Sequence, residues 1–121
     1  MIPAASPSAR LVLGALAVAA VAGWASAQTR ASSRATSLAR GHGFVERACA
    51  GCHGVEVSGE SPNSRAPRFR DLAARRTDAQ LAAEIAEISR NGHLEMPPIY
   101  VTPDETADVV AYMRSLTGRA T

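Results

Sequence analysis

The residues most able to do chemistry in this chain are its cysteines and the histidine that follows them. Cys49 and Cys52 precede His53 in the pattern C-x-x-C-H, and the sequence contains no other cysteine. Two thiols three residues apart at the end of a helix can reach the two vinyl groups on one edge of a porphyrin. The imidazole of His53 would then lie beneath the ring and bind the iron. The pattern therefore predicts covalent attachment of one c-type haem.

Three other interpretations of the cysteines are possible. A thiol–disulfide redox pair usually follows a strand in a βαβ unit, whereas these cysteines end a predicted helix with no predicted strand nearby. A zinc site needs four ligands, and Cys49, Cys52 and His53 would need a distant second histidine to complete it. A plain structural disulfide, with the motif arising by chance, is the third alternative. The C-x-x-C-H pattern is the attachment pattern of c-type haem, so the haem interpretation is favoured over all three.

A low-spin haem iron that carries electrons needs a second axial ligand, and Met96 is the favoured candidate. It lies in a turn-rich loop between two predicted helices, and Pro97 disfavours helical backbone at the residue before it. Pro97 and Pro98 stiffen the loop, so little conformational entropy remains to be lost when a side chain is held at the iron. A methionine–histidine pair also raises the reduction potential relative to two imidazoles. The sequence thus predicts iron ligation by His53 and Met96.

Other residues compete with Met96 for this role. His93 lies in the same loop, and Met113 lies on the apolar side of a predicted helix, where core packing is the simpler explanation. His42 precedes Cys49 by seven residues on the same predicted helix. That helix is expected to pack against the haem edge, so His42 is interpreted as a solvated helix residue. The alternative role for Met96 itself is to fill a gap beneath the loop.

Hydrophobic periodicity and capping signals predict three helices and hence an all-α fold with loops rich in glycine and proline. The first helix is predicted from about Thr36 to Ala50. The second begins with a capping box at Thr77 and stops at Gly92. The third begins after the N-cap Thr102, with proline as its first residue, and ends at Gly118. No segment shows convincing strand alternation.

Residues 1–27 have the three-part layout of a secretory signal. Arg10 is followed by an apolar run of 14 residues, Leu11 to Trp24, and Ala25 to Ala27 supply small residues at a cleavage site. An uncleaved anchor is the alternative, although 14 residues are short against the roughly 20 of a membrane-spanning helix. We therefore expect export to the periplasm with cleavage of the signal. A retained signal would be the protein's only contact with a membrane.

The remainder is predicted to be one small domain. Residues 28–36 are polar and lack apolar periodicity, so they are interpreted as a flexible lead before a domain of residues 37–118. A domain this small often needs a metal, disulfides or a cofactor for stability. Its basic residues, all arginines, nearly balance its acidic ones, so no basic surface for nucleic acid is predicted. A monomer is the default expectation at this size.

Over residues 39–116 the chain resembles the class I cytochrome c family. That family has a small residue eight positions before the first haem cysteine and an apolar residue four positions before it, which here are Gly41 and Val45. It packs its first helix crosswise against its last through an aromatic residue, matched here by Tyr112. The resemblance implies a cytochrome c fold of three to four helices wrapped around one covalent haem. The crossing explains Gly41, because two close backbones tolerate little side chain between them.

The resemblance also implies roles for Pro67 and Phe69. In the family, a proline after the attachment site accepts a hydrogen bond from the ligand histidine through its carbonyl, and Pro67 follows His53 by 14 residues. An ordinary turn proline is the alternative. Phe69 would pack against the porphyrin. Mitochondrial members bind a haem propionate with a tryptophan, but Trp24 lies in the predicted signal. The residues that could replace it, among which no choice is made, are Arg65, Arg68, Arg70 and Tyr100.

The function implied by the resemblance is electron transport by haem iron that cycles between the ferric and ferrous states. The chain would then be a carrier and not an enzyme, docking transiently with a dehydrogenase, an oxidase or a membrane cytochrome complex. It could instead be the electron-accepting subunit of a periplasmic dehydrogenase or oxidase. If Met96 does not bind the iron, a ligand-binding or peroxidatic haem protein is the next alternative. A thiol–disulfide oxidoreductase fits the sequence less well than these.

Overall fold

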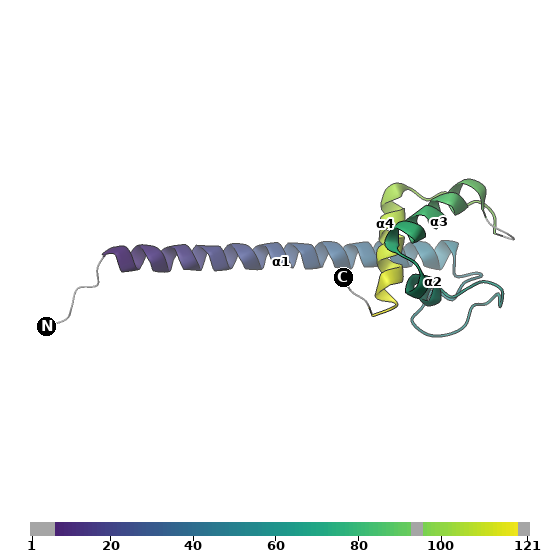
Figure 1. The fold of residues 1–121 in the computed structure, drawn as a ribbon, viewed down its shortest axis with the longest axis horizontal. Coiled ribbons are helices and arrows are strands. Elements are labelled where there is room, and N and C mark those ends of the chain that lie inside the picture. Colours follow the sequence, from purple (N-terminus) through teal and green to yellow (C-terminus); the bar gives the residue numbers. More distant parts are fainter. Residues whose placement is uncertain (1–6, 93–95, 119–121) are drawn as a thin grey trace. The chain divides into compact units, whose positions relative to one another are not determined.

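The computed structural model describes residues 7–92 and 96–118, with side chains described at Trp24 and from Ser26 onward, and these residues form four helices (Figure 1). No β-strand occurs in these ranges, and the predicted all-α class is confirmed. The helices are α1 (Pro7–Ala48), α2 (Phe69–Arg75), α3 (Asp78–Asn91) and α4 (Pro103–Ser115).

The chain divides into two compact units, residues 1–34 and residues 35–121. Helix α1 begins at Pro7, much earlier than the predicted start near Thr36, and residues 28–36 are helical where we expected a flexible lead. The difference has a local reason: no glycine or proline occurs between Gly23 and Gly41 to interrupt the helical backbone. No helix within the described residues is both long and apolar enough to span a membrane. Cleavage of the signal stays a prediction.

In the second unit, α4 runs across the C-terminal part of α1, and Gly41 lies at the contact (Figure 1). A Cβ atom at Gly41 would lie only 2.2 Å from the carbonyl oxygen of Asp108 and 2.9 Å from Cβ of Tyr112. Such distances leave no room for any side chain. The close crossing of the first and last helices that we predicted at Gly41 is therefore confirmed.

The hydrophobic core of this unit draws on all four helices and on the loop after α1. Helix α4 contributes the largest share, and both α2 and α3 pack against it. The buried apolar residues are Val45, Val55, Phe69, Ala73, Leu81, Val109, Val110, Tyr112 and Met113.

Local capping bonds fix where α3 and α4 begin. The Thr77 hydroxyl accepts from the backbone of Gln80, whose side chain in turn accepts from the backbone of Thr77. Thr102 and Glu105 make the same reciprocal pair at the start of α4. Both predicted N-termini are thus confirmed. Helix α4 ends at Ser115, three residues before the predicted stop at Gly118.

Two charged residues of α4 tie it to the other helices. The carboxylate of Asp108 accepts hydrogen bonds from Ser37 at 2.5 Å and from Nε of Arg40 at 2.6 Å, both on α1. At the other end of α4, the guanidinium of Arg114 donates to the carbonyl oxygens of Ala73 and Arg76 and to the carboxylate of Asp78. Arg114 thereby fixes the corner between α2 and α3.

Removing the charge of Asp108 is expected to change the acid sensitivity of the fold. The hydrogen bonds from Arg40 hold the pKa of Asp108 below its ordinary value, with a further contribution from Ser37, while partial burial opposes them. The pKa of Asp108 is lower in the folded state than in the unfolded state, where it is about 4. The stabilisation by the Asp108 carboxylate is therefore complete above about pH 4 and is lost as the pH falls through the folded-state pKa. Asp108→Asn should therefore destabilise the protein at pH 7, and the difference from wild type should shrink at pH 3. Urea unfolding at the two pH values measures this, and an equal difference at both would contradict it.

Candidate functional site

The C-x-x-C-H segment forms a helical turn that follows α1 directly. The backbone N–H groups of Cys52 and His53 both donate to the carbonyl of Cys49, at 3.1 and 3.0 Å. No disulfide joins Cys49, which is half-buried, to Cys52, which is exposed. Burial raises the pKa of the Cys49 thiol to about 11. Thiols that act in disulfide exchange have lowered pKa values instead, so burial makes the Cys49 thiol less reactive than those.

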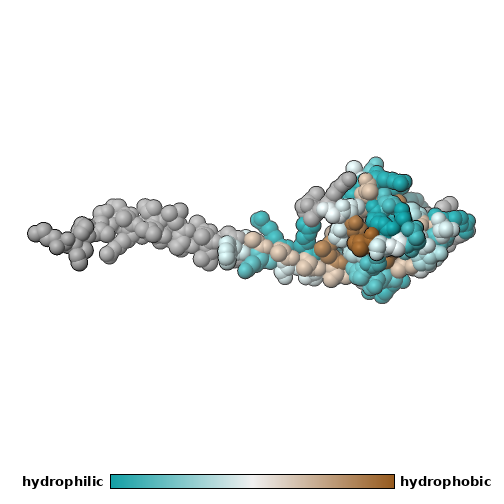
Figure 2. Space-filling view, turned by 90° about the horizontal axis from the view of Figure 1, so that it is seen from below, coloured by the Kyte–Doolittle hydropathy of each residue, from teal (hydrophilic) through white to brown (hydrophobic). Residues whose placement is uncertain are grey.

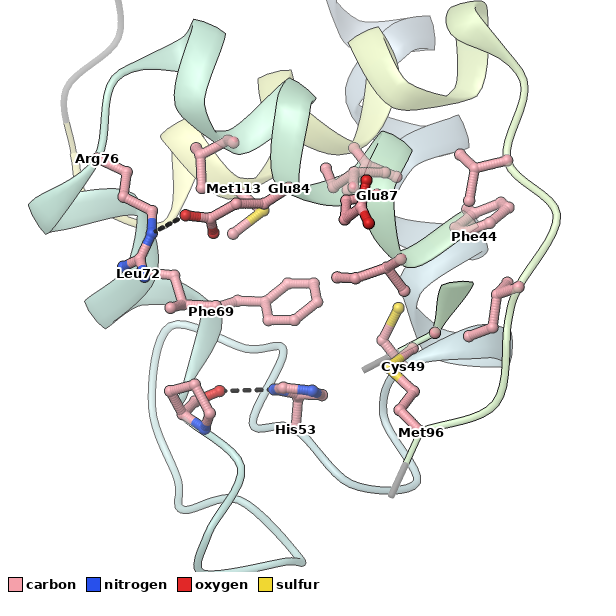
Figure 3. Close-up of a pocket in the computed structure, with 18 residues that line it drawn as sticks. Phe44, Cys49, His53, Phe69, Leu72, Arg76, Glu84, Glu87, Met96 and Met113 are labelled. Atoms are coloured by element: carbon pink, nitrogen blue, oxygen red, sulfur yellow. Dashed lines mark hydrogen bonds and ion pairs between the residues drawn. The ribbon is translucent and has the colours of Figure 1, made fainter. Parts of the chain in front are cut away.

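The imidazole of His53 is buried, with 6% of the residue exposed, and its orientation is fixed from two sides. Its Nδ1 atom lies 2.7 Å from the carbonyl oxygen of Pro67, and its ring centroid lies 5.3 Å from that of Phe69 (Figure 3). Because a carbonyl can only accept, Nδ1 carries the proton and donates it. Neutral imidazole in that tautomer has its lone pair on Nε2, which is the form that binds a metal. The structure thus brings Pro67 and Phe69 together with His53.

A network of polar contacts holds the loop between His53 and α2 in place. The backbone N–H of Gly54 donates to the Ser61 hydroxyl at 2.9 Å, and the backbone N–H of Phe69 donates to the carbonyl of Gly54 at the same distance. Arg68 bonds the carboxylates of Glu60 and Asp71, each at 2.7 Å. These bonds bring the carbonyl of Pro67 within reach of the His53 ring.

A cavity of about 400 Å³ opens beside Cys49 and His53 (Figure 3). Its volume lies within the range of cofactor sites, which are typically apolar with a few polar groups. On the face of the molecule seen in Figure 2, hydrophobic residues gather in one area surrounded by hydrophilic ones. The apolar residues that line the cavity are Phe44, Pro67, Phe69, Leu72, Leu81, Ile85, Ile88, Met96, Ile99, Val101, Val109 and Met113.

The residues present fit a covalently attached haem. Cys49 and the imidazole of His53 both line the large apolar cavity, and thioether sulfurs are available from Met96 and Met113, which line it too. Thioether and imidazole are established axial ligands of haem iron. Cys52, although one residue from His53, is exposed and does not line the cavity.

Met96 and Met113 both line the cavity, but their settings differ. Met113 lies on α4 and is only 2% exposed, so it is part of the packed core as expected. Met96 is half-buried in the loop between α3 and α4. His93, the competing ligand candidate, lies outside the described residues. A loop methionine can reach a bound group without disturbing the core, which favours Met96.

Gly92 closes the loop that carries Met96. It ends α3 with a φ of 64°, in the left-handed region, and a Cβ atom there would lie 2.4 Å from the carbonyl oxygen of Met96. Gly92→Ala should therefore displace the backbone of Met96. We expect the far-red absorption band of ferric haem that marks a sulfur–iron bond to weaken or disappear. An unchanged band in the folded variant would show that this contact does not position Met96.

The cavity also contains charged residues that the sequence analysis did not identify. Arg76, Glu84 and Glu87 line it, and Nε of Arg76 lies 2.6 Å from a carboxylate oxygen of Glu84 (Figure 3). Glu84 could have been found, because it shares the helical stripe of Leu81 and Ile88. The four residues considered as partners of a haem propionate do not line the cavity: Arg65, Arg68, Arg70 and Tyr100.

Comparison with known families adds an independent finding. A family model described as Cytochrome c matches residues 38–117, more than half of the chain, and this range contains the C-x-x-C-H segment, the cavity and the loop methionine. No curated protein matches the chain, and neither does any solved structure.

Proposed function

Because the chain belongs to the cytochrome c family, we propose that it is an exported one-electron carrier whose haem c is attached through Cys49 and Cys52 and ligated by His53 and Met96. The observation that carries this proposal is the buried imidazole of His53. Its Nδ1 donates to the Pro67 carbonyl, and its ring is packed beside an apolar cavity that Cys49 and Met96 also line.

The contacts of His53 with the Pro67 carbonyl and the Phe69 ring support its role as the fixed ligand. The hydrogen bond from Nδ1 to Pro67 orients the ring and raises the basicity of the other nitrogen. Phe69 packs against the ring and leaves it little freedom to turn. A ligand held in one orientation limits the rearrangement that accompanies electron transfer.

When bound, haem c supplies one-electron exchange between ferric and ferrous iron. The apolar cavity residues exclude water and lower the local dielectric constant, which disfavours the extra positive charge of the oxidised form. A thioether ligand from Met96 acts in the same direction, so a reduction potential above that of a bis-histidine haem is expected.

Location and partners belong to the same proposal. The apolar run before Ala27 has the layout of a secretory signal and supports export to the periplasm. The exposed position of Cys52 supports a cofactor edge near the surface, as transfer to a partner requires. The partners would be redox proteins, namely a dehydrogenase, an oxidase or a membrane cytochrome complex, that dock through a small, transient interface.

Two measurements test this function: a spectroelectrochemical titration of the haem, and exposure of the reduced protein to carbon monoxide. A carrier should show one reversible one-electron step, and its reduced form should not bind carbon monoxide because both axial positions are filled. A reduced spectrum that shifts rapidly under carbon monoxide would contradict the carrier function. It would favour a ligand-binding or peroxidatic haem protein.

A further inference from the structure

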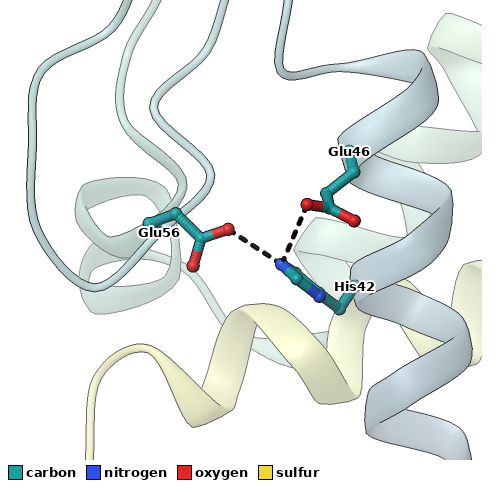
Figure 4. A group of neighbouring side chains, drawn as sticks. All are labelled: His42, Glu46 and Glu56. Atoms are coloured by element: carbon teal, nitrogen blue, oxygen red, sulfur yellow. Dashed lines mark hydrogen bonds and ion pairs between the residues drawn. The ribbon is translucent and has the colours of Figure 1, made fainter.

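A second group of possible metal ligands meets outside the cavity, on residues that the proposed electron-transfer site does not use. Nε2 of His42 lies 2.8 Å from a carboxylate oxygen of Glu56 and 3.8 Å from one of Glu46 (Figure 4). One donor atom from each of the three side chains lies within 4.8 Å of both others. We call His42, Glu46 and Glu56 the His–Glu–Glu cluster.

The donors of this cluster come from two separate segments. His42 and Glu46 are four residues apart on α1, so their side chains lie on the same face of the helix. Glu56 belongs to the loop that follows His53. An ion held by all three would therefore join α1 to this loop.

Residues that are not themselves ligands hold the cluster in place. The ring of Tyr112 packs beside the imidazole of His42, with centroids 4.9 Å apart. The Tyr112 hydroxyl donates to the carbonyl of Val55 at 2.9 Å and lies 3.4 Å from the second carboxylate oxygen of Glu56. Arg70 donates to the backbone carbonyl of Glu56 at 3.3 Å. Supporting contacts of this kind orient metal ligands at established sites.

We propose that the His–Glu–Glu cluster binds a divalent cation of the zinc type, with water completing its coordination. Imidazole nitrogen and carboxylate oxygen are ligands of Zn²⁺, whereas Ca²⁺ and Mg²⁺ prefer oxygen ligands alone. Two carboxylates balance the charge of the ion. The side chains are 37%, 58% and 54% exposed for His42, Glu46 and Glu56, so an ion and its water can enter from solvent.

The donor spacing requires only small adjustments. Bonds of about 2.1 Å in a tetrahedral site place neighbouring donors about 3.4 Å apart. The observed separations of 2.8 and 3.8 Å lie on either side of that value, and no two of the donor atoms are more than 4.8 Å apart. The carboxylates of Glu46 and Glu56 are more than half exposed, so solvent surrounds the groups that have to move.

Calorimetric titration of the purified exported protein with Zn²⁺ tests the proposal, because Zn²⁺ has no redox chemistry and cannot exchange electrons with the haem. We expect one ion per chain. His42→Gln and Glu56→Gln should each weaken binding at least about tenfold, the lower limit for losing even an outer-shell partner at a metal site. Asp104→Asn, which removes an exposed carboxylate at the start of α4, should bind Zn²⁺ like wild type.

The thermal midpoint gives a second measurement. Zn²⁺ should raise the Tm of wild type and of Asp104→Asn, but should raise that of His42→Gln much less, since the ion bridges α1 and the loop only when all three ligands are present. Absence of Zn²⁺ binding to wild type, or equal binding to His42→Gln and wild type, would overturn the proposal and leave the cluster as a group of hydrogen-bonded side chains. The visible haem spectrum should be the same in all these variants, so the outcome is independent of the proposed axial ligands.

Discussion

Replacing Gly41 by alanine is expected to destabilise the protein by more than about 3 kcal/mol, the upper end of what overpacking usually costs. The added Cβ would lie 2.2 Å from the carbonyl oxygen of Asp108, and backbone on a packed helix cannot move aside as a side-chain tip can. Helices α1 and α4 would have to separate. Because α4 also forms part of the cavity through Val109 and Met113, the cofactor site should be disturbed as well.

Gly43 provides the matched control on the same helix. A Cβ there would meet only the terminal nitrogen of Arg47, at 3.3 Å, which is the flexible end of a side chain. Alanine favours helix over glycine by about 1 kcal/mol, so Gly43→Ala should stabilise the protein. Urea unfolding of the two variants measures both effects. If the two substitutions changed the midpoint by similar amounts in the same direction, the close crossing at Gly41 would not be the cause.

Substituting leucine for Met96 is expected to remove the proposed sulfur–iron bond while nearly preserving the side-chain volume. The far-red band of the ferric protein should vanish, and the reduction potential should fall by on the order of 100 mV, a fraction of the roughly 0.8 V over which axial ligands tune haem. The reduced variant should also gain the ability to bind carbon monoxide, because one axial position is then open.

Met113→Leu is the control for this experiment, since Met113 lines the same cavity but is packed in the core. A volume-conserving replacement there should cost less than about 1.5 kcal/mol and leave the far-red band in place. Loss of the band in Met113→Leu with retention in Met96→Leu would reverse the ligand assignment. Absence of the band from the wild-type ferric protein would transfer the assignment to a residue other than methionine, with His93 as the next candidate.

The parts of the fold that could be predicted are those specified by local bonds. Helices α3 and α4 begin where Thr77 and Thr102 are followed three residues later by a side chain that completes the capping box. Helix α2 was not predicted because its seven residues are too few for a periodic pattern and its N-cap, Arg68, makes no side-chain capping bond. Helix α1 begins earlier than predicted because polar composition alone does not end a helix, and no glycine or proline lies between Gly23 and Gly41 to interrupt it.

The features of the candidate site also divide into those that the sequence predicts and those that depend on tertiary contacts. The motif ending at His53 and its contact with Pro67 could be predicted, one from spacing and the other from family resemblance. The pairing of Arg76 with Glu84 could not be predicted from the sequence, because it depends on how α2 and α3 meet. His42 was interpreted as a solvated residue, but it contacts Glu56, 14 residues away on a loop that only tertiary contacts bring near. Sequence spacing alone contains no information about such a contact.

The most direct test of the central claim is a pyridine haemochrome spectrum of the purified protein after denaturation and washing with acidified acetone. The wash removes haem that is held only by iron ligation and packing. We predict that the haem stays with the protein and gives the spectrum of a porphyrin whose vinyl groups have become thioethers to Cys49 and Cys52. A colourless washed protein, made in a host able to attach haem, would contradict the account.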